Sequence, residues 1–282
     1  MLAERIDIIT PHITDSHHLE YPCFKPGFAC ELELPQWAPI HLGPLTLDLS
    51  PTKHVVMLWI AAALCLITLL IAARAHKRQS AGGGASKGFA NGIEALVLYI
   101  RQEVVIPNVG HHGEKYAPFI LTLFFFILFA NLLGLIPYGA TATGNIAVTG
   151  TLAAITFVFV EAVGMKTLGR NYIKTIVYWP SDQPLAMKLF LSPILTPIEL
   201  FGKFTKPLAL AIRLFANMTA GHIVVLALIG LIFTFGSYYI APAPILMAFA
   251  IMVLEVFIAF LQAYVFALLA SVFIGLIREG AH

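Results

Sequence analysis

Long runs of apolar residues alternate with short polar segments along this chain. Residues 55–73 and 117–160 contain no Asp, Glu, Lys or Arg. Because a helix that crosses a membrane needs about 20 predominantly apolar residues, the first run predicts one membrane span and the second predicts two. Residues 136–145, which include Pro, Gly and Asn, predict the turn between the second and third spans.

Two further apolar runs, residues 189–236 and 240–278, are longer than one crossing requires. As continuous helices they would measure about 72 and about 58 Å, whereas the apolar core of a bilayer is about 30 Å thick. Gly236, Pro242 and Pro244 predict a hinge between the two runs. We therefore expect a long antiparallel helical hairpin that kinks, lies partly on the membrane surface or is steeply tilted.

Residues 88–106 carry the pattern of an amphipathic helix. Apolar residues recur there at helical spacing, and polar residues fall elsewhere on the helical wheel. The apolar positions are Phe89, Ile93, Leu96, Ile100 and Val104, and the polar ones are Glu94, Arg101 and Gln102. A flexible Gly-rich segment precedes this helix, which we expect to lie along the membrane surface.

These patterns predict an all-α integral membrane fold with five membrane segments and one amphipathic surface helix. Its parts are a polar N-terminal segment at 1–53, a first membrane helix at 54–75, a flexible linker and surface helix at 76–115, a membrane helix pair at 116–177 and the long hairpin at 178–282. Basic residues directly after the first span predict that this end faces the cytoplasm. The N-terminus is then outside, and an odd number of spans places the C-terminus inside.

Composition supports this class and excludes others. Hydrophobic residues make up 59% of the chain and charged residues 11%, and the mean hydropathy is +0.85. The formal net charge is only +2, and no basic run is interleaved with aromatic residues, so no nucleic-acid partner is expected. The polar start of the chain does not match a cleavable signal peptide, so the first span should itself direct insertion.

Cys23 and Cys30 bracket a turn-prone loop in the N-terminal segment. The two can form a disulfide if this segment faces an oxidising compartment, and otherwise they stay reduced. No spacing of Cys or His resembles a zinc site, so we expect neither a bound metal nor a cofactor. The scattered histidines of this segment are interpreted as solvated polar residues.

Five polar residues interrupt the apolar hairpin, and these are Arg213, Asn217, His222, Glu255 and Gln262. On insertion scales, an arginine at the centre of a membrane helix costs about 2.5 to 3.5 kcal/mol, so Arg213 is the first functional candidate. The alternative is that its side chain reaches back to the membrane surface, as we expect for Lys203 and Lys206.

Helical geometry relates these residues across the hairpin. His222 lies about 13.5 Å beyond Arg213 along one helix, and Gln262 lies about 10.5 Å beyond Glu255 along the other. Because the helices are antiparallel, we expect His222 to lie level with Glu255. By the same register, we expect Arg213 to lie level with Gln262.

The level of His222 and Glu255 differs in its chemistry from the level of Arg213 and Gln262. Histidine and glutamate can exchange protons, whereas arginine keeps its proton and repels a hydrated one. A proton path interrupted by Arg213 would need a mobile carboxylate from another subunit to carry the proton past it. The alternative for His222 and Glu255 is a buried pair that serves only packing.

The sequence RLFANMTAG, residues 213–221, resembles the signature around the essential arginine of the F-type ATP synthase a subunits. Lys206 and Pro207 resemble the pair upstream of it, and Glu199 resembles an acidic residue at the start of that helix. NLLGLIP, residues 131–137, and LQAYVF around Gln262 resemble two further elements of the family. The resemblance covers roughly residues 50–278. Some members carry an acidic residue where Gly134 stands here, so its role must be filled otherwise.

The resemblance implies a non-catalytic, proton-conducting subunit in a bacterial inner membrane. Its partners would be the ring of c subunits, the b subunits of the peripheral stalk, the rest of the complex and membrane lipid. Protons would reach a ring carboxylate through an outer half-channel lined by Asn131, His222, Glu255 and Gln262. They would leave through a second half-channel near Glu199, with Arg213 between the two.

Two other classes of membrane protein are alternatives to this resemblance. A self-contained proton-coupled secondary transporter predicts inverted repeats and broken helices, and neither is visible in the sequence. A b-type haem carrier needs paired axial ligands, but His222 is the only histidine deep inside a span.

Overall fold

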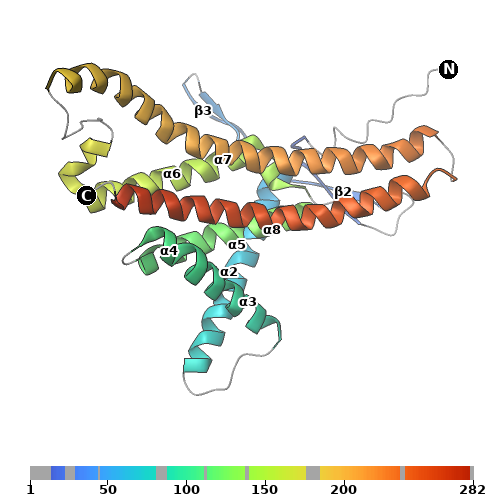
Figure 1. Cartoon of the computed structure of the whole chain (residues 1–282). Coiled ribbons are helices and arrows are strands. Elements are labelled where there is room, and N and C mark those ends of the chain that lie inside the picture. The colour runs from blue at the N-terminus through green and yellow to red at the C-terminus, as the bar shows by residue number, and fades with distance from the viewer. Residues whose placement is uncertain are drawn as a thin grey trace. The chain divides into compact units, whose positions relative to one another are not determined.

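The computed structural model describes residues 14–22, 29–43, 45–80, 88–110, 113–136, 140–175, 185–235 and 239–279 (Figure 1). Within those residues, five helices are long and apolar enough to cross a membrane. They are α2 (Lys53–Ser80), α5 (Ala117–Gly134), α6 (Ile146–Leu168), α7 (Leu185–Phe235) and α8 (Pro242–Glu279). The predicted all-α membrane fold with five membrane segments is therefore confirmed.

Shorter helical elements connect these membrane helices. α3 (Phe89–Tyr99), a π-helical segment (Ile100–Val105) and α4 (Ile106–Val109) follow one another directly. Turns of 3-10 helix occur at Gly113–Tyr116, Ala142–Gly144 and Gly169–Thr175. The turn predicted at residues 136–145 is confirmed, because α5 ends at Gly134 and α6 begins at Ile146.

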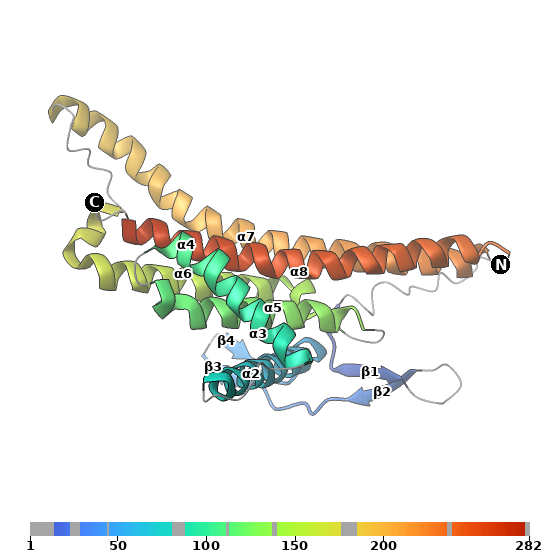
Figure 2. The ribbon, with the colours of Figure 1, turned by 60° about the horizontal axis from the view of Figure 1, so that its bottom comes forward.

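The two long C-terminal helices comprise 51 residues in α7 and 38 in α8. α7 continues through Pro193, Pro197 and Pro207, although each proline removes a backbone donor from the helix. The C-terminal part of α7 lies beside the N-terminal part of α8 (Figure 2). Their tilt in a membrane stays a prediction.

The chain forms two compact units, and each long membrane helix contributes to both. Unit 1 consists of Met1–Leu69, Phe125–Val148 and Leu214–Ala263, and unit 2 of Leu70–Phe124, Thr149–Arg213 and Tyr264–His282. In unit 1, Ile127, Leu214 and Ala259 are fully buried. In unit 2, Val104, Phe266 and Ile274 are fully buried. The polar side chains described below belong to one unit or the other.

The N-terminal segment forms two short antiparallel hairpins rather than helices. β1 (His18–Pro22) pairs with β2 (Ala29–Glu33), and β3 (Ile40–Leu42) pairs with β4 (Leu45–Leu47). Several prolines in this segment disfavour long helices, because proline removes a backbone donor and clashes with the preceding turn. The strands themselves were not predicted from the sequence.

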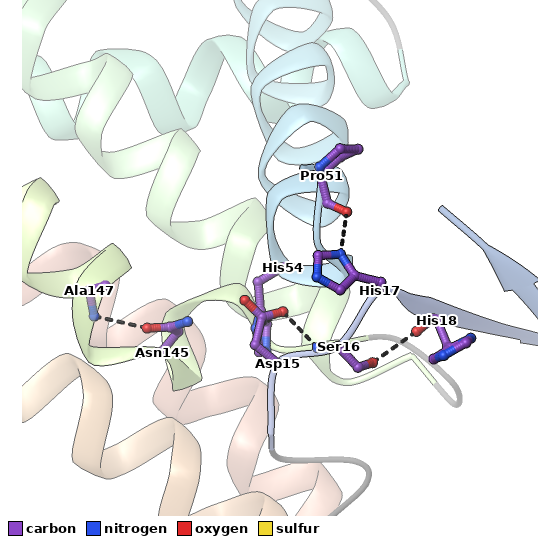
Figure 3. A network of polar contacts seen from close by, with 8 residues as sticks. All are labelled: Asp15, Ser16, His17, His18, Pro51, His54, Asn145 and Ala147. Carbon is purple, nitrogen blue, oxygen red and sulfur yellow. Dashed lines mark hydrogen bonds and ion pairs between the residues drawn. The ribbon is translucent and has the colours of Figure 1, made fainter. Parts of the chain in front are cut away.

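Polar contacts fasten this segment to the start of α2 (Figure 3). The backbone N–H of Lys53 donates to the carbonyl of Ser16 at 2.9 Å, and His17 Nδ1 lies 3.3 Å from the carbonyl oxygen of Pro51. Asp15 Oδ1 lies 2.8 Å from Nδ1 of His54, which is buried. These contacts fix how the chain enters the first membrane helix.

A second contact tightens the last loop before α2. The backbone N–H of Ser50 donates to Asp48 Oδ1 at 2.9 Å, and the Ser50 hydroxyl oxygen accepts a bond from the Trp37 N–H at 2.9 Å. Hydrogen bonds from the side chain and backbone of Ser50 lower the pKa of the Asp48 carboxyl, because they stabilise its charged form.

Cys30 lies on β2 and is disulfide-bonded. Cys23 lies outside the described residues, so the pairing of these two cysteines stays a prediction. Cys65 is buried in α2 and is not disulfide-bonded. Within the described residues, no three His, Cys, Asp or Glu side chains gather closely enough to hold a metal ion.

The amphipathic pattern at residues 88–106 was only partly right. Ile93, Ile100 and Val104 are buried as predicted. However, Phe89 is 77% exposed although it was assigned to the apolar face, and Glu94 is only 8% exposed although it was assigned to the polar face. Phe89 is the first residue of α3, and Glu94 lies 3.6 Å from His76 of α2, a contact that the periodicity of residues 88–106 does not predict.

In unit 2, two glycines leave room for close contacts between elements, one with a backbone and one with a side chain. A Cβ added at Gly275 of α8 would overlap the carbonyl oxygen of Asn108 in α4, and one added at Gly164 of α6 would overlap the side chain of Ile277. Arg278 Nη1 also donates to the carbonyl of Val109 at 2.7 Å. The end of α8 therefore packs directly on the α4 backbone.

We predict that Gly275→Ala destabilises the protein by about 1–3 kcal/mol, the usual cost of forcing extra atoms into a packed contact. Gly150→Ala in α6 is the matched control, because a Cβ at Gly150 meets no atom within 4 Å. The control should leave stability unchanged or raise it by up to about 1 kcal/mol, since alanine favours helix. Thermal unfolding in detergent measures both, and equal midpoints for the two variants would contradict the close contact.

Candidate functional site

The long helices of unit 1 carry an acid–base pair. His222 Nδ1 on α7 lies 3.8 Å from Glu255 Oε1 on α8, which is the pairing that the helix register predicts. The Glu255 side chain is 6% exposed and that of His222 is 22% exposed. Glu255 Oε1 is buried and receives no hydrogen bond from the described residues.

A glycine makes room for this carboxylate. A Cβ added at Gly221 of α7 would overlap the carboxyl oxygen of Glu255. Because glycine has no side chain, the two helices approach closely at this level, and the Glu255 side chain lies against the backbone of α7. The sequence analysis placed Gly221 in a motif but gave it no role of its own.

Asn131 of α5 stands at the centre of a second group of contacts in unit 1. It is fully buried, accepts a hydrogen bond from the Thr143 hydroxyl at 2.7 Å and donates to the carbonyl of Ala259 at 3.5 Å. The bond to Ala259 joins α5 to α8 one turn beyond Glu255. Asn131 therefore holds the turn after α5 and the helix that carries the carboxylate.

The Thr141 hydroxyl lies in hydrogen-bond contact with Nε2 of His222. Thr141 is 5% exposed and Thr143 is fully buried, and both come from the short turn between α5 and α6. The sequence analysis assigned these residues only to a turn and so missed their contacts. The sequence does contain one signal for these contacts. Thr141 and Thr143 come directly before an apolar run, that of α6, which is expected to lie beside the polar residues of the hairpin.

Asn217 and Gln262 form the amide pair of unit 1. Asn217 Nδ2 donates to Gln262 Oε1 at 3.0 Å, and Gln262 is 1% exposed. The prediction placed Gln262 level with Arg213, whereas its hydrogen bond is to Asn217, one helical turn beyond Arg213. Gln262 Nε2 is buried and has no hydrogen-bond partner among the described residues, so this amide is only half satisfied.

Arg213 of α7 is the last residue of its segment in unit 2 and is exposed. Within the described residues, it makes no hydrogen bond or ion pair. Ala209, Ala216 and Asn217, which lie one turn away on the same side of α7, are also exposed, so the guanidinium stands on an open helix face. A cation on such a face is expensive in a membrane unless an anion from another molecule meets it.

Unit 2 contains a cavity of about 350 Å³ with charged walls. Its lining includes Glu161, Glu199, Lys203 and Lys206 together with Thr156, Thr175, Leu210 and Phe273. Glu199, which was predicted as a site residue, is exposed and lines this cavity. Of the predicted proton-path residues, Glu199 and Arg213 belong to unit 2.

A cluster of polar contacts closes one wall of this cavity. The Tyr172 hydroxyl donates to Glu161 Oε2, and Lys203 Nζ lies 3.4 Å from the same oxygen. Lys203 also donates to the Thr175 hydroxyl at 3.2 Å. The sequence analysis expected Lys203 to reach the membrane surface, and the structure instead gives it two polar partners inside unit 2.

Comparisons with known proteins agree with the resemblance. The family model described as ATP synthase A chain matches residues 55–275. A protein of Chloroherpeton thalassium named ATP synthase subunit a is 44% identical over 97% of this chain and 77% of its own length. A protein of the same name from Myxococcus xanthus is 49% identical over 84% of this chain and 76% of its own length.

We predict that Thr143→Val destabilises unit 1 by about 1–3 kcal/mol, because it leaves the buried Asn131 oxygen without its donor. Thr234→Val is the control, since the Thr234 hydroxyl is exposed and donates only to the carbonyl of Gly230 one turn earlier. Thermal unfolding in detergent should separate the two variants by several degrees. Equal stability would mean that the Thr143 bond does not hold the turn.

Proposed function

The chain belongs to the ATP synthase A chain family, and from this premise we propose that it is the proton-translocating stator subunit of an F-type ATP synthase. It offers two offset aqueous half-channels to a carboxylate on a ring of c subunits, and Arg213 separates them. The chemistry of ATP lies in other subunits of the complex. The observation that carries this proposal is the exposed guanidinium of Arg213, which has no hydrogen bond or ion pair with any residue that the structure describes.

An exposed cation on an open helix face in a membrane needs an anion, and none of the described residues supplies one. A carboxylate carried past on a rotating ring meets this need only for part of each cycle. While it faces Arg213 it stays ionised, because a nearby cation favours the charged form. Since arginine does not release its own proton, it cannot pass protons from one half-channel to the other.

The residues of unit 1 suit the half-channel that takes up protons. His222 and Glu255 are both able to exchange protons, and Asn131 and Gln262 supply buried polar atoms in the same unit. Protons from outside would pass this group and load the ring carboxylate. An imidazole at this position favours proton over sodium coupling, because it can bind a proton but is not a usual ligand of sodium.

The cavity of unit 2 suits the half-channel that releases protons. Glu199 is exposed and lines this cavity, and among the described residues it has no hydrogen bond or ion pair. An ionised carboxylate there attracts a departing proton without holding a fixed partner. We place this side in the cytoplasm, which corresponds to an N-terminus outside and a C-terminus inside a bacterial inner membrane.

The remaining partners follow from the exposed surfaces. The apolar faces of α7 and α8 carry exposed Leu208, Ile212, Val253 and Phe257, which suit contact with the apolar helices of a ring. The surface helix α3 is proposed to contact the b subunits of the peripheral stalk. Membrane lipid would cover the exposed apolar side chains of α2, among them Trp59 and Leu66.

We predict that Arg213→Ala abolishes ATP-driven proton pumping by the assembled complex in inverted vesicles. Without the cation, the ring carboxyl group does not release its proton, and the two half-channels are no longer separated. Arg170→Ala is the control, because Arg170 is also exposed but lies in the 3-10 turn after α6. The control should pump like the wild type, and retained pumping by the Arg213 variant would overturn the proposal.

A second variant tests the uptake side. Glu255→Gln keeps the size of the side chain but removes its ability to titrate, so it should slow pumping by about 100-fold, the lower end of what a positioned acid–base group contributes. Assembly, measured by copurification of the complex, should be unchanged. A wild-type rate between about pH 6 and pH 9 would rule out this role for Glu255.

A further inference from the structure

The turn between α5 and α6 places a hydroxyl where a missing side chain leaves room. A Cβ added at Gly134, the last residue of α5, would overlap the Thr141 hydroxyl and the rest of that side chain. The backbone N–H of Gly144 donates to the carbonyl of Thr141 at 2.9 Å, which folds the turn back on itself. Thr141 thus fills the space beside α5 that a larger residue at position 134 would occupy.

This hydroxyl lies in hydrogen-bond contact with one nitrogen of an imidazole whose other nitrogen faces a carboxylate. Thr141 contacts Nε2 of His222, and Nδ1 of the same ring lies 3.8 Å from Glu255 Oε1. The two contacts come from opposite sides of the ring, so together they fix its orientation. A hydroxyl can donate to a bare ring nitrogen and can also accept from a protonated one, so the contact survives a change of tautomer or charge.

The turn is itself fixed to the helices on either side. Thr143 donates to Asn131 of α5, and Asn131 donates to the backbone of α8 at Ala259. Among the described residues, Glu255 is the charged group within 4 Å of the imidazole. Thr141, from the turn, and Gly221, beside His222 on α7, carry no charge. The electrostatic environment of His222 therefore depends on Glu255, and its orientation depends on Thr141.

We propose that Thr141 is a positioning residue for proton uptake, which holds the His222 ring so that Nδ1 faces Glu255. The proposal rests on the proposed function, because it assigns Thr141 to the uptake path of unit 1. Without the hydroxyl, the ring turns to other rotamers, and the acid–base pair is lost for part of the time. Thr141 acts through His222 and does not itself need to contact the ring of c subunits.

The test compares variants of the full complex in inverted vesicles. Thr141→Val removes the hydroxyl at constant shape and should lower ATP-driven pumping near neutral pH by about fivefold, which corresponds to one hydrogen bond of about 1 kcal/mol. Thr141→Ser keeps the hydroxyl and should stay within about twofold of wild type. Thr68→Val is the control, since Thr68 is a buried threonine of α2 away from this turn, and it should pump like the wild type.

The dependence of pumping on pH separates positioning from a general loss of structure. Thr141→Val should change the shape of the rate profile between about pH 6 and pH 9, because it alters how the imidazole meets Glu255. A merely damaged protein would show the wild-type profile scaled down. Gly134→Ala should reproduce the altered shape, because the added Cβ displaces the hydroxyl without removing it.

A wild-type rate and profile for Thr141→Val, or equal losses in the valine and serine variants, would overturn the role of Thr141. If the valine variant does not assemble, Thr141→Ala is compared with Thr141→Ser by the same criterion. Arg213→Ala in the same vesicles distinguishes the two proposals. Proton pumping by the Arg213→Ala variant would overturn the proposed function. If Arg213→Ala does not pump and Thr141→Val pumps like the wild type, only the proposal for Thr141 is overturned.

Discussion

The scarcity of hydrogen-bond partners in an apolar membrane governs where this chain can place polar side chains. In water, an unpaired amide or guanidinium binds solvent, but between apolar helices it must find a partner in the protein or remain costly. Asn131 meets this condition through Thr143 and Ala259, and the Gln262 oxygen meets it through Asn217, although Gln262 Nε2 has no partner among the described residues. Arg213 has no such partner among the described residues. The molecule thus leaves its costliest group unsatisfied, and that is where we propose a transient partner binds.

Glycines decide how closely polar side chains can approach one another. The carboxylate of Glu255 lies against Gly221, and the hydroxyl of Thr141 lies against Gly134. In both places a single added carbon would displace the polar group. Because a hydrogen bond weakens steeply with distance, the geometry around His222 depends as much on these two missing side chains as on the polar residues themselves.

The sequence predicted the features that periodicity and charge control. Helix lengths, the turn after α5 and the level of His222 with Glu255 follow from apolar runs and from a rise of about 1.5 Å per residue. Features that depend on tertiary contacts were missed. Glu94 is buried and lies 3.6 Å from His76, a contact between α3 and α2 that the periodic pattern of α3 does not predict. The π-helical segment after α3 is likewise absent from any periodic pattern.

The contacts of Lys203 were missed for a related reason. Its partners Glu161 and Thr175 are 42 and 28 residues away, and only the packing of α6 on α7 brings them together. When each residue is considered alone, a lysine near the start of an apolar run is expected to extend its side chain to the membrane surface. The N-terminal strands are a similar case, because short hairpins of mixed polarity give only a weak alternating signal.

Charge compensation differs between the two units in a way that matches the direction of the proposed proton path. In unit 2, Glu161 Oε2 accepts a hydrogen bond from the Tyr172 hydroxyl and lies 3.4 Å from Nζ of Lys203, so this carboxylate is held by a hydroxyl and a cation. In unit 1, one oxygen of Glu255 has no donor, and the nearby imidazole can take up or release a proton. The group proposed for proton uptake thus contains an imidazole, whereas the described lining of the cavity proposed for release contains carboxylates and lysines but no histidine. In the proposed function, Arg213 keeps its proton, so protons pass from uptake to release only on a carrier that moves past the helix.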